Sequence, residues 1–325
     1  MPRKKKVDPQ PSSLENPKCP TCRKPETQLF RIGVREDPTR HVYVCRLCAM
    51  RFIEPPFDDI REYYRNTYRG SHDYEPGKKL TPEQRFLLMR PTVEYKAKFF
   101  KEHVPEGGSV LEIGCSSGFF LAAIQDSYDV YGAEWNPEDA AYVRDVGEIP
   151  CEEGDIEDIY PGKQFSAICA YAVLEHQPDP IAWLKKVKSR LIGGGHLMIE
   201  VPNSEEALLT LYDIPEFRDF WYREPHICNF NLTNLTAVMA EAGFEARSNT
   251  RQDYSLWNHM HWIWNRTPMS DPREARDFGH PVPPNHPAAS WMNRLFERWD
   301  KEYRMSLDTA KAGNTLVCHG RKIEI

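Results

Sequence analysis

A turn rich in glycine and serine stands between a strand-like apolar run and a helix-like apolar run. Residues 110–120 read VLEIGCSSGFF, and the apolar sequence continues to Ile124. Gly114 and Gly118 lack a Cβ atom, so they permit positive φ angles and let the backbone approach a ligand closely. The helix that begins here offers free N–H groups at its first turn, and these favour an electronegative guest. The pattern predicts a strand, turn and helix that bind a cofactor.

An acid follows the next apolar run. Residues 130–133 read as a second strand, and Glu134 comes directly after it. A carboxylate roughly 20 residues after such a turn is where a doubly wound sheet holds a ribose diol. A nicotinamide-binding site is possible in principle, although the spacing is not G-x-G-x-x-G. Two other interpretations remain open. GCSSG also fits the nucleophile elbow of α/β-hydrolases, with Ser116 as the nucleophile, and a tight turn beside a buried acid needs no ligand.

Four cysteines are spaced for a metal ion: Cys19, Cys22, Cys45 and Cys48. Two C-x-x-C pairs at this separation can place four thiolates around a tetrahedral zinc ion. A segment this short has too little core to fold without such a cross-link. We therefore predict a zinc ribbon over residues 18–54 with a structural zinc ion, because four thiolates leave no open coordination position. A redox dithiol is the alternative.

The bulk properties limit the class of protein. The chain has 325 residues and a net charge of -6, which argues against nucleic acid as a partner bound through overall charge. No apolar run approaches the roughly 20 residues of a membrane span, and the start does not read as a secretory signal. We expect a cytoplasmic protein. Residues 1–17, with four basic residues followed by prolines and serines, predict a disordered tail, with a nucleic-acid tether as the alternative.

Residues 55–100 predict a helical linker or lid between the ribbon and the sheet. A helix is expected from Pro82 to Phe100. Four tyrosines precede it, and they either form a packing stripe or line the acceptor pocket: Tyr63, Tyr64, Tyr68 and Tyr74.

The remaining chain, 101–325, alternates strand and helix patterns. Asn136 and Pro137 predict the start of a helix as N-cap and first helical residue. Further strands are expected near residues 149–156, 165–171, 196–203 and 314–320, with a glycine turn at 193–195 and helices at 181–191, 233–242 and 291–307. This order predicts an α/β fold with a doubly wound, mostly parallel, seven-stranded sheet and an antiparallel final strand. An aromatic-rich insertion at about 253–312 predicts a pocket wall, with a homodimer contact as the alternative.

Three segments resemble class I S-adenosylmethionine (SAM) dependent methyltransferases. The family's first motif, acid-x-Gly-x-Gly-x-Gly, is matched by Glu112, Gly114, Ser116 and Gly118, with serine in place of the middle glycine. VLEHQPDP at 173–180 and LIGGGHLMIEVPN at 191–203 match two later segments. The resemblance covers 110 to about 250 and implies SAM as the cofactor. It also implies this set of cofactor-binding residues: Glu112, Gly114, Cys115, Ser116, Gly118, Glu134, Trp135, Asp155, Ile156 and Ala170.

The same resemblance suggests catalytic residues. His176 in VLEH is a candidate general base, with shaping of the cofactor loop as the alternative. Zinc-ribbon methyltransferases that act on sugars carry a glutamate directly before a histidine, whereas this chain has Glu224, an inserted Pro225 and then His226. His226, His176 and Glu224 are the predicted catalytic residues.

The resemblance therefore implies a SAM-dependent methyltransferase with a small-molecule acceptor. The expected acceptor is a sugar, a nucleotide-linked sugar or a surface-polysaccharide unit, methylated on oxygen or carbon. The alternatives are an RNA or protein methyltransferase whose ribbon grips the macromolecule, and a SAM-binding scaffold without catalysis.

Overall fold

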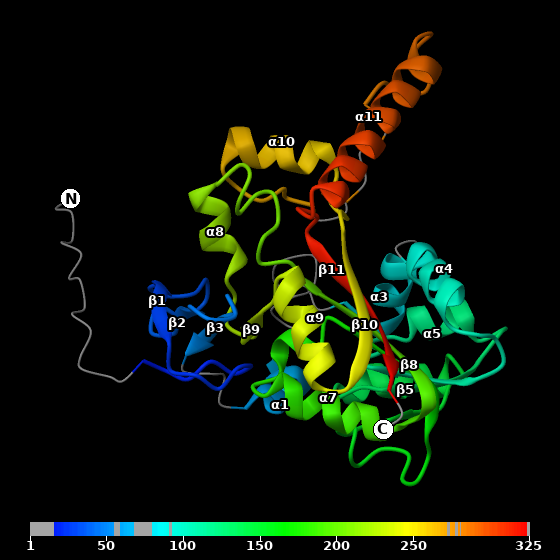
Figure 1. The fold of residues 1–325 in the computed structure, drawn as a ribbon. Helices are drawn as coiled ribbons and strands as arrows, with labels where there is room; N and C mark the ends of the chain where they lie inside the picture. The colour runs from blue at the N-terminus through cyan, green and yellow to red at the C-terminus, as the bar shows by residue number, and fades with distance from the viewer. Residues whose placement is uncertain are drawn as a thin grey trace.

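Two β-sheets organise the chain (Figure 1). The computed structural model describes residues 16–54, 59–67, 80–90, 93–271, 274–276, 279 and 281–323. Most of the tail predicted at 1–17 lies outside these residues, as do Tyr68 and Tyr74 of the predicted lid.

The large sheet has seven strands in the order β10-β11-β8-β7-β4-β5-β6. Neighbours from β6 to β8 run parallel, and β11 is antiparallel to both β8 and β10. This confirms the predicted doubly wound sheet with its antiparallel final strand. The strands are β4 (Ser109–Ile113), β5 (Asp129–Ala133), β6 (Cys151–Glu152), β7 (Phe165–Tyr171), β8 (Leu191–Pro202), β10 (Phe244–Arg251) and β11 (Thr315–Lys322).

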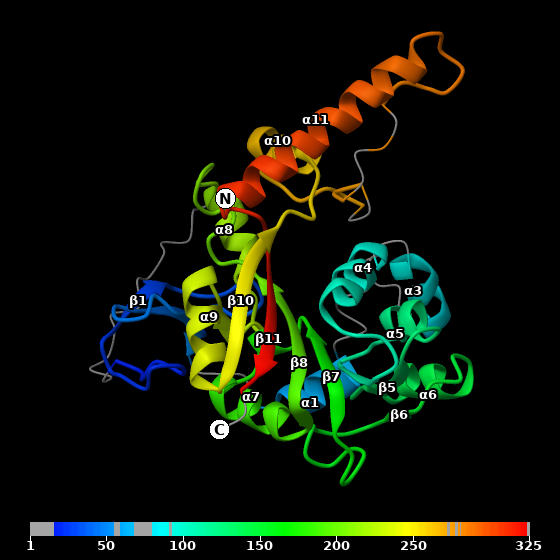
Figure 2. The ribbon, with the colours of Figure 1, turned by 45° about the vertical axis from the view of Figure 1, so that its right-hand side comes forward.

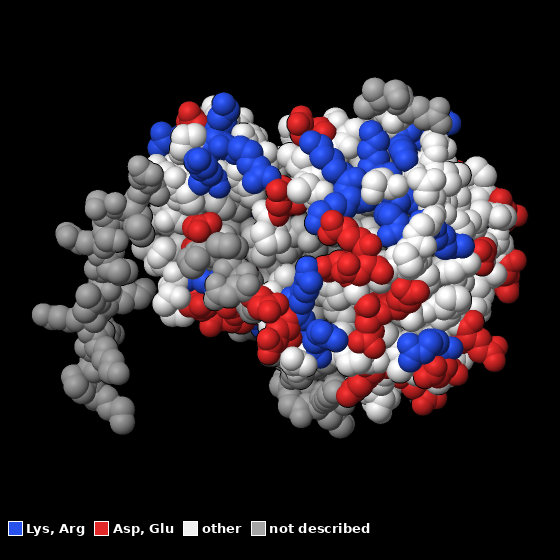
Figure 3. Space-filling view, turned by 90° about the horizontal axis from the view of Figure 1, so that it is seen from below, with Lys and Arg blue, Asp and Glu red and all other residues white. Residues whose placement is uncertain are grey.

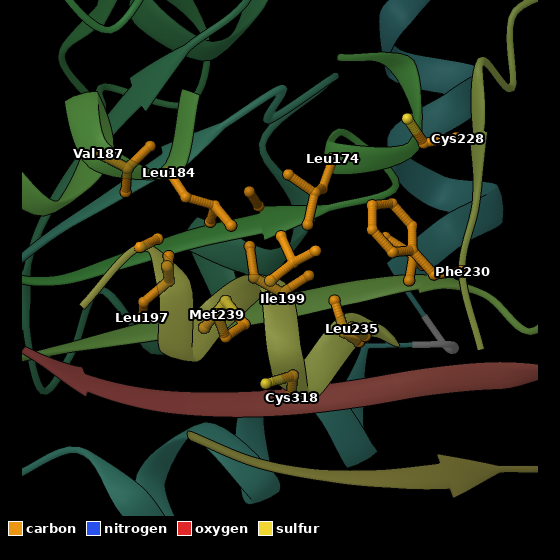
Figure 4. Close-up of a cluster of buried hydrophobic side chains, with 14 of the residues drawn as sticks. Leu174, Leu184, Val187, Leu197, Ile199, Cys228, Phe230, Leu235, Met239 and Cys318 are labelled. Carbon is orange, nitrogen blue, oxygen red and sulfur yellow. The ribbon is translucent and has the colours of Figure 1, made fainter. Parts of the chain in front are cut away.

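Helices cover both faces of this sheet (Figure 2). Along β8, Leu197 and Ile199 pack with one hydrophobic cluster and Met198 with another, because successive side chains of a strand point to opposite faces. Figure 4 shows the first cluster, to which α7 and α9 contribute; α4, α5 and α6 supply the second. These helices are α4 (Glu94–His103), α5 (Phe119–Ile124), α6 (Pro137–Asp145), α7 (Pro180–Ser189) and α9 (Leu232–Glu241).

Two sequence expectations differ from the structure in their details. The helix expected over 82–100 is two helices, α3 (Pro82–Met89) and α4. Pro91 lies between them in the sequence, and proline has no N–H to continue a helical ladder. The glycines at 193–195 were expected to form a turn before a strand, but β8 already begins at Leu191 and includes them. Gly194 has φ +69°, a conformation that glycine adopts without strain.

The small sheet combines three strands from the N-terminal part of the chain with one strand from its second half. Three strands come from the N-terminal segment, β1 (Thr27–Arg31), β2 (His41–Cys45) and β3 (Arg51–Glu54). The fourth, β9 (Cys228–Asn229), comes from the segment that follows α8 (Pro215–Trp221). The ribbon is therefore completed by a strand from the part of the chain that follows β8.

The segment between β10 and β11 carries the aromatic-rich insertion. It contains α10 (Leu256–Asn265) and α11 (Ala289–Thr309), and α11 extends away from the large sheet in both ribbon views (Figures 1 and 2). Trp264 and Trp291 are more than half exposed. A dimer contact on these helices remains a prediction.

A buried acid after β8 makes stability depend on pH. Glu206 is 2% exposed, its Oε2 has no hydrogen-bond partner among the described residues, and burial raises its pKa to about 8. An unfolded glutamate titrates near 4.3, so between these pH values the folded state holds a proton that the unfolded state has lost. The group therefore destabilises the folded state increasingly as pH rises through this window.

We expect Glu206→Gln to raise the free energy of unfolding at pH 9 by up to about 5 kcal/mol and to change it much less at pH 5. Urea unfolding at both pH values measures the difference. Glu216→Gln, on the exposed side of α8, is the matched control. An equal effect of Glu206→Gln at both pH values would show that its ionisation does not matter.

Candidate active site

The glycine-rich turn after β4 has the left-handed backbone that its sequence predicts. Gly114, Ser116 and Gly118 have φ angles of +73°, +51° and +76°. The N–H groups of Gly114 and Cys115 donate to the carbonyl of Ala133 at 2.8 and 3.1 Å, so β5 supports the turn. A Cβ atom at Gly114 would lie 2.8 Å from a methyl group of Val173, which leaves no room for a larger residue. Ser116 adopts this left-handed conformation although, unlike glycine, it has a Cβ atom.

Glu134 fixes this turn from the end of β5. One carboxylate oxygen accepts from the N–H of Ser116 at 2.8 Å, and the other accepts from the N–H of Asn136 at 2.9 Å. Asn136 also caps α6 through its side chain, as predicted. The carboxylate therefore lies beside the turn, where the sequence predicts contact with a ribose diol.

We expect Glu134→Ala to weaken SAM binding about 5- to 150-fold, equivalent to roughly 1–3 kcal/mol, because a charged acceptor of hydrogen bonds is lost. Calorimetric titration with SAM measures the change. Asp145→Ala, at the exposed end of α6, provides the control. Unchanged affinity in Glu134→Ala would place the ribose elsewhere.

The buried acid in the strand before the turn also fits SAM. Glu112 is 3% exposed, and its Oε2 has no partner among the residues the structure describes. Burial raises its pKa well above the usual range, which marks an acid short of compensating charge. SAM carries an ammonium group on its methionine part, and such a cation would satisfy a carboxylate at this place.

Two short helices within the predicted lid border a hollow beside Trp135, which directly follows Glu134. They are α1 (Ile60–Glu62) and the π-helical η1 (Tyr63–Thr67). Arg61 forms an ion pair with Asp155. The hollow has a volume of about 120 Å³ and is lined by Arg61, Arg65, Trp135, Glu153, Gly154, Asp155 and Asp158. Two predicted cofactor residues, Trp135 and Asp155, thus lie together at this hollow.

Three other predicted cofactor residues have their side chains in the core. Ile156 and Ala170 belong to the main hydrophobic cluster. The Cys115 sulfur lies 3.7 Å from that of Cys151, fully buried. At Cys115 the backbone, which belongs to the turn, is therefore the part available to a cofactor.

The two predicted catalytic histidines lie side by side. His176 ends the short helix η3 (Leu174–His176), and its ring centroid is 5.2 Å from that of His226. The Nδ1 atom of His176 is 2.6 Å from the carbonyl oxygen of Pro225. A carbonyl only accepts hydrogen bonds, so Nδ1 carries the hydrogen, and in the neutral ring Nε2 holds the lone pair. The hydroxyl of Tyr64 lies 2.7 Å from Nε2 and donates to it.

Glu175 is a site residue that the sequence analysis did not select. It is 1% exposed, and within the described part of the chain neither carboxyl oxygen has a hydrogen-bond partner. One oxygen lies 3.8 Å from Nε2 of His176. Burial raises its pKa to about 8, so the carboxyl is mostly neutral at pH 7. The signal in the sequence was an acid placed directly beside a candidate base in an apolar run.

This group also has a spacing that could accept a metal ion. Ligand atoms of Glu175, His176 and His226 all lie within 4.8 Å of one another. Binding of a cation there would require the Glu175 carboxyl to release its proton.

Glu224 is not placed with the two histidines. Its carboxylate forms an ion pair with Arg40, 3.1 Å from Nε, and its backbone N–H donates to Glu36. The inserted Pro225 separates it from His226 and presents its own carbonyl to His176. Its predicted catalytic role stays a prediction.

The four cysteines converge as predicted. Sulfur atoms of Cys19 and Cys48 are 3.5 Å apart, as are those of Cys22 and Cys45, and all four lie within 4.8 Å of one another. A tetrahedral ion with metal–sulfur distances of 2.3 Å would separate its ligands by about 3.8 Å. The cluster fits a structural zinc ion.

Among the described helices, none is both long and apolar enough to cross a membrane.

Comparison with known proteins identifies the catalytic class. The profile of a methyltransferase-domain family matches residues 83–249, more than half of the chain. A tRNA U34 carboxymethyltransferase of Alteromonas mediterranea is 24% identical over 159 residues, which cover 43% of this chain and 46% of that protein. Its counterpart from Pseudoalteromonas translucida is 25% identical over 137 residues, covering 36% and 40%. The chain thus matches less than half the length of these curated relatives.

Two solved structures are also similar to this chain, at low identity. A SAM-dependent methyltransferase of Archaeoglobus fulgidus is 14% identical with a TM-score of 0.48, covering 73% of this chain and 99% of that one. Magnesium protoporphyrin IX methyltransferase of Synechocystis, solved with SAH, is 12% identical with a TM-score of 0.47, covering 81% and 98%. On the family match, this chain belongs to the methyltransferase-domain family.

Proposed function

We propose that the enzyme methylates a hydroxyl group of a small, sugar-type acceptor. The observation that supports this most is the hydrogen bond from the Tyr64 hydroxyl to Nε2 of His176 at 2.7 Å. An alcohol in the place of the tyrosine hydroxyl would donate its proton in the same way. This contact supports a base at Nε2 of His176 that acts on a hydroxyl group.

The chain's own residues divide the work as follows. SAM, when bound, supplies a methyl group on a sulfonium centre. Nε2 of His176 takes the proton of the acceptor's hydroxyl group as the hydroxyl oxygen attacks the methyl group. The Pro225 carbonyl stabilises the resulting imidazolium by accepting from Nδ1–H. The neutral carboxyl of Glu175 can donate a hydrogen bond, which helps to orient the acceptor. Positioning by the lid and the turn supplies much of the remaining rate.

Buried polar groups without hydrogen-bond partners favour an acceptor with several hydroxyls. Ser204 Oγ, Glu206 Oε2 and Asn229 Oδ1 are buried without hydrogen-bond partners among the described residues. Asn229 lies next to the catalytic segment, since its amide donates to the carbonyl of His226 at 3.1 Å. A ligand that carries hydrogen-bond donors would satisfy such buried hydrogen-bond acceptors. Methylation at carbon would use the same base and is the alternative within this class.

An RNA acceptor is the second candidate, because the curated relatives are tRNA carboxymethyltransferases. On the face shown in Figure 3, acidic side chains lie among basic ones. The whole chain has 48 acidic and 42 basic residues, which does not favour a phosphate backbone. An RNA acceptor predicts turnover that falls steeply with salt, whereas a small neutral acceptor predicts a nearly flat response.

Transfer of a labelled methyl group from SAM into separate pools of nucleotide-sugars, glycans, RNA and protein tests the proposal. We expect label in a sugar-containing pool. Label in RNA or protein alone would overturn the acceptor while leaving the enzyme class in place. SAM binding with no label in any pool would indicate a scaffold.

A further inference from the structure

We infer that the zinc ribbon forms a wall of the catalytic site, and that Arg51 in it is a positioning residue for His176. The ribbon holds residues 222–229, named here the histidine loop. The inference rests on the proposed function only in treating His176 as the base. The contacts that carry it lie on both sides of the histidine loop.

On one side, the histidine loop is a strand of the ribbon's own sheet. Arg51 and Phe52 of β3 pair antiparallel with Asn229 and Cys228 of β9. The N–H of Ile53 donates to the carbonyl of Ile227 at 2.9 Å, which extends the pairing by one residue toward His226. The backbone of the loop is therefore fixed relative to β3.

Side chains of the ribbon secure the start of the same loop. Arg51 donates through Nη1 to the carbonyl of Ser204 at 2.5 Å and lies 3.3 Å from the Tyr222 hydroxyl. The N–H of Arg35 donates to the carbonyl of Tyr222 at 2.9 Å. Arg40 pairs with Glu224, which assigns that glutamate a role in holding the loop. Arg51 thus connects the histidine loop to the segment after β8.

On the other side, the loop contacts the segment that carries the base. The Pro225 carbonyl accepts from Nδ1 of His176, and the thiol of Cys228 donates to the carbonyl of Gln177 at 3.4 Å. Leu174 of η3 and Cys228 belong to one hydrophobic cluster, drawn in Figure 4. Phe52 of the ribbon belongs to the same cluster.

The histidine loop is therefore held between β3 and η3. Its Pro225 carbonyl decides which nitrogen of His176 carries the hydrogen, and hence which nitrogen faces the acceptor as a base. A shift of the loop would weaken this hydrogen bond and allow the ring to rotate or change tautomer. Loss of the Arg51 guanidinium removes two of the contacts that prevent such a shift.

We expect Arg51→Ala to lower kcat by about ten- to a hundredfold, as a misplaced catalytic group does, with SAM affinity unchanged. It should also shift the ¹⁵N NMR signals of the His176 ring and move the pH profile of kcat. Arg51→Lys, which keeps one donor, should restore part of the rate. Arg46→Ala is the matched control, since Arg46 is an exposed ribbon residue whose side chain contacts Gln28 of the ribbon. Zinc content and far-ultraviolet circular dichroism establish that each variant is folded.

Unchanged His176 signals and unchanged kcat in folded Arg51→Ala would overturn the inference. If Arg51→Ala does not fold, Arg40→Gln removes a contact to the same loop and is read by the same signals. The NMR measurement needs no acceptor, so it tests the role of Arg51 separately from the proposed function. Full activity of His176→Gln would overturn the proposed base, while coupling between Arg51 and the His176 ring could still be observed.

Discussion

Replacing His176 by glutamine should lower kcat by about 10²- to 10⁴-fold, the usual contribution of a general base. Glutamine keeps a similar length and can still donate to the Pro225 carbonyl, but its amide has no basic nitrogen. The predicted SAM-binding residues lie on β4 and the turn after it, on β7 and on the segments after β5 and β6, so the dissociation constant for SAM should stay within about twofold. Steady-state kinetics with the labelled acceptor and calorimetry with SAM measure the two effects separately.

His286→Gln is the control for this experiment, because His286 is exposed in the segment before α11. A His176→Gln enzyme that retains its rate would shift the role of base to His226, whose ring lies beside it. A large loss of SAM affinity would instead indicate that His176 shapes the cofactor loop, the alternative that the sequence left open.

Removal of zinc should abolish turnover as well as destabilise the ribbon. The ribbon is too small to keep its fold without the ion, and β3 would then no longer hold β9 and the histidine loop. We expect kcat to fall more than about a hundredfold, because the base loses its orientation, while much of the SAM affinity persists. Chelation followed by parallel assays of turnover and SAM binding tests this, and added zinc should restore the rate.

Cys22→Ser should reproduce the effect of chelation without any chelator. Retained turnover in folded, zinc-free protein would show that the histidine loop keeps its position without the ribbon. Equal losses of turnover and SAM binding would show that the whole domain had unfolded, so that the ribbon acts on overall stability alone.

The features that the sequence predicted well depend on neighbouring residues. The turn at Gly114–Gly118, the Asn136 cap and the strand over 165–171 each follow from a few consecutive residues. The helix break between α3 and α4 could have been found in the same way, since Pro91 stands inside the predicted helix.

The features that the sequence did not predict join distant parts of the chain. The pairing of β3 with β9 and the Arg40–Glu224 ion pair connect residues far apart in sequence, and no local pattern encodes them. Glu175 was passed over because the sequence does not show that its carboxyl is buried without a partner. Its unusual pKa is a property of the packed structure.

The use of β9 to complete the ribbon has a consequence for synthesis of the protein. The last N-terminal ribbon strand, β3, ends at Glu54, and β9 follows about 175 residues later. At typical rates of about 5–20 residues per second, the ribosome needs roughly 10–35 seconds to produce this interval. During that time the edge of β3 has no β9 to pair with, and an unpaired edge can bind another chain. Early binding of zinc would limit this risk, so metal supply during translation should influence the yield of folded enzyme.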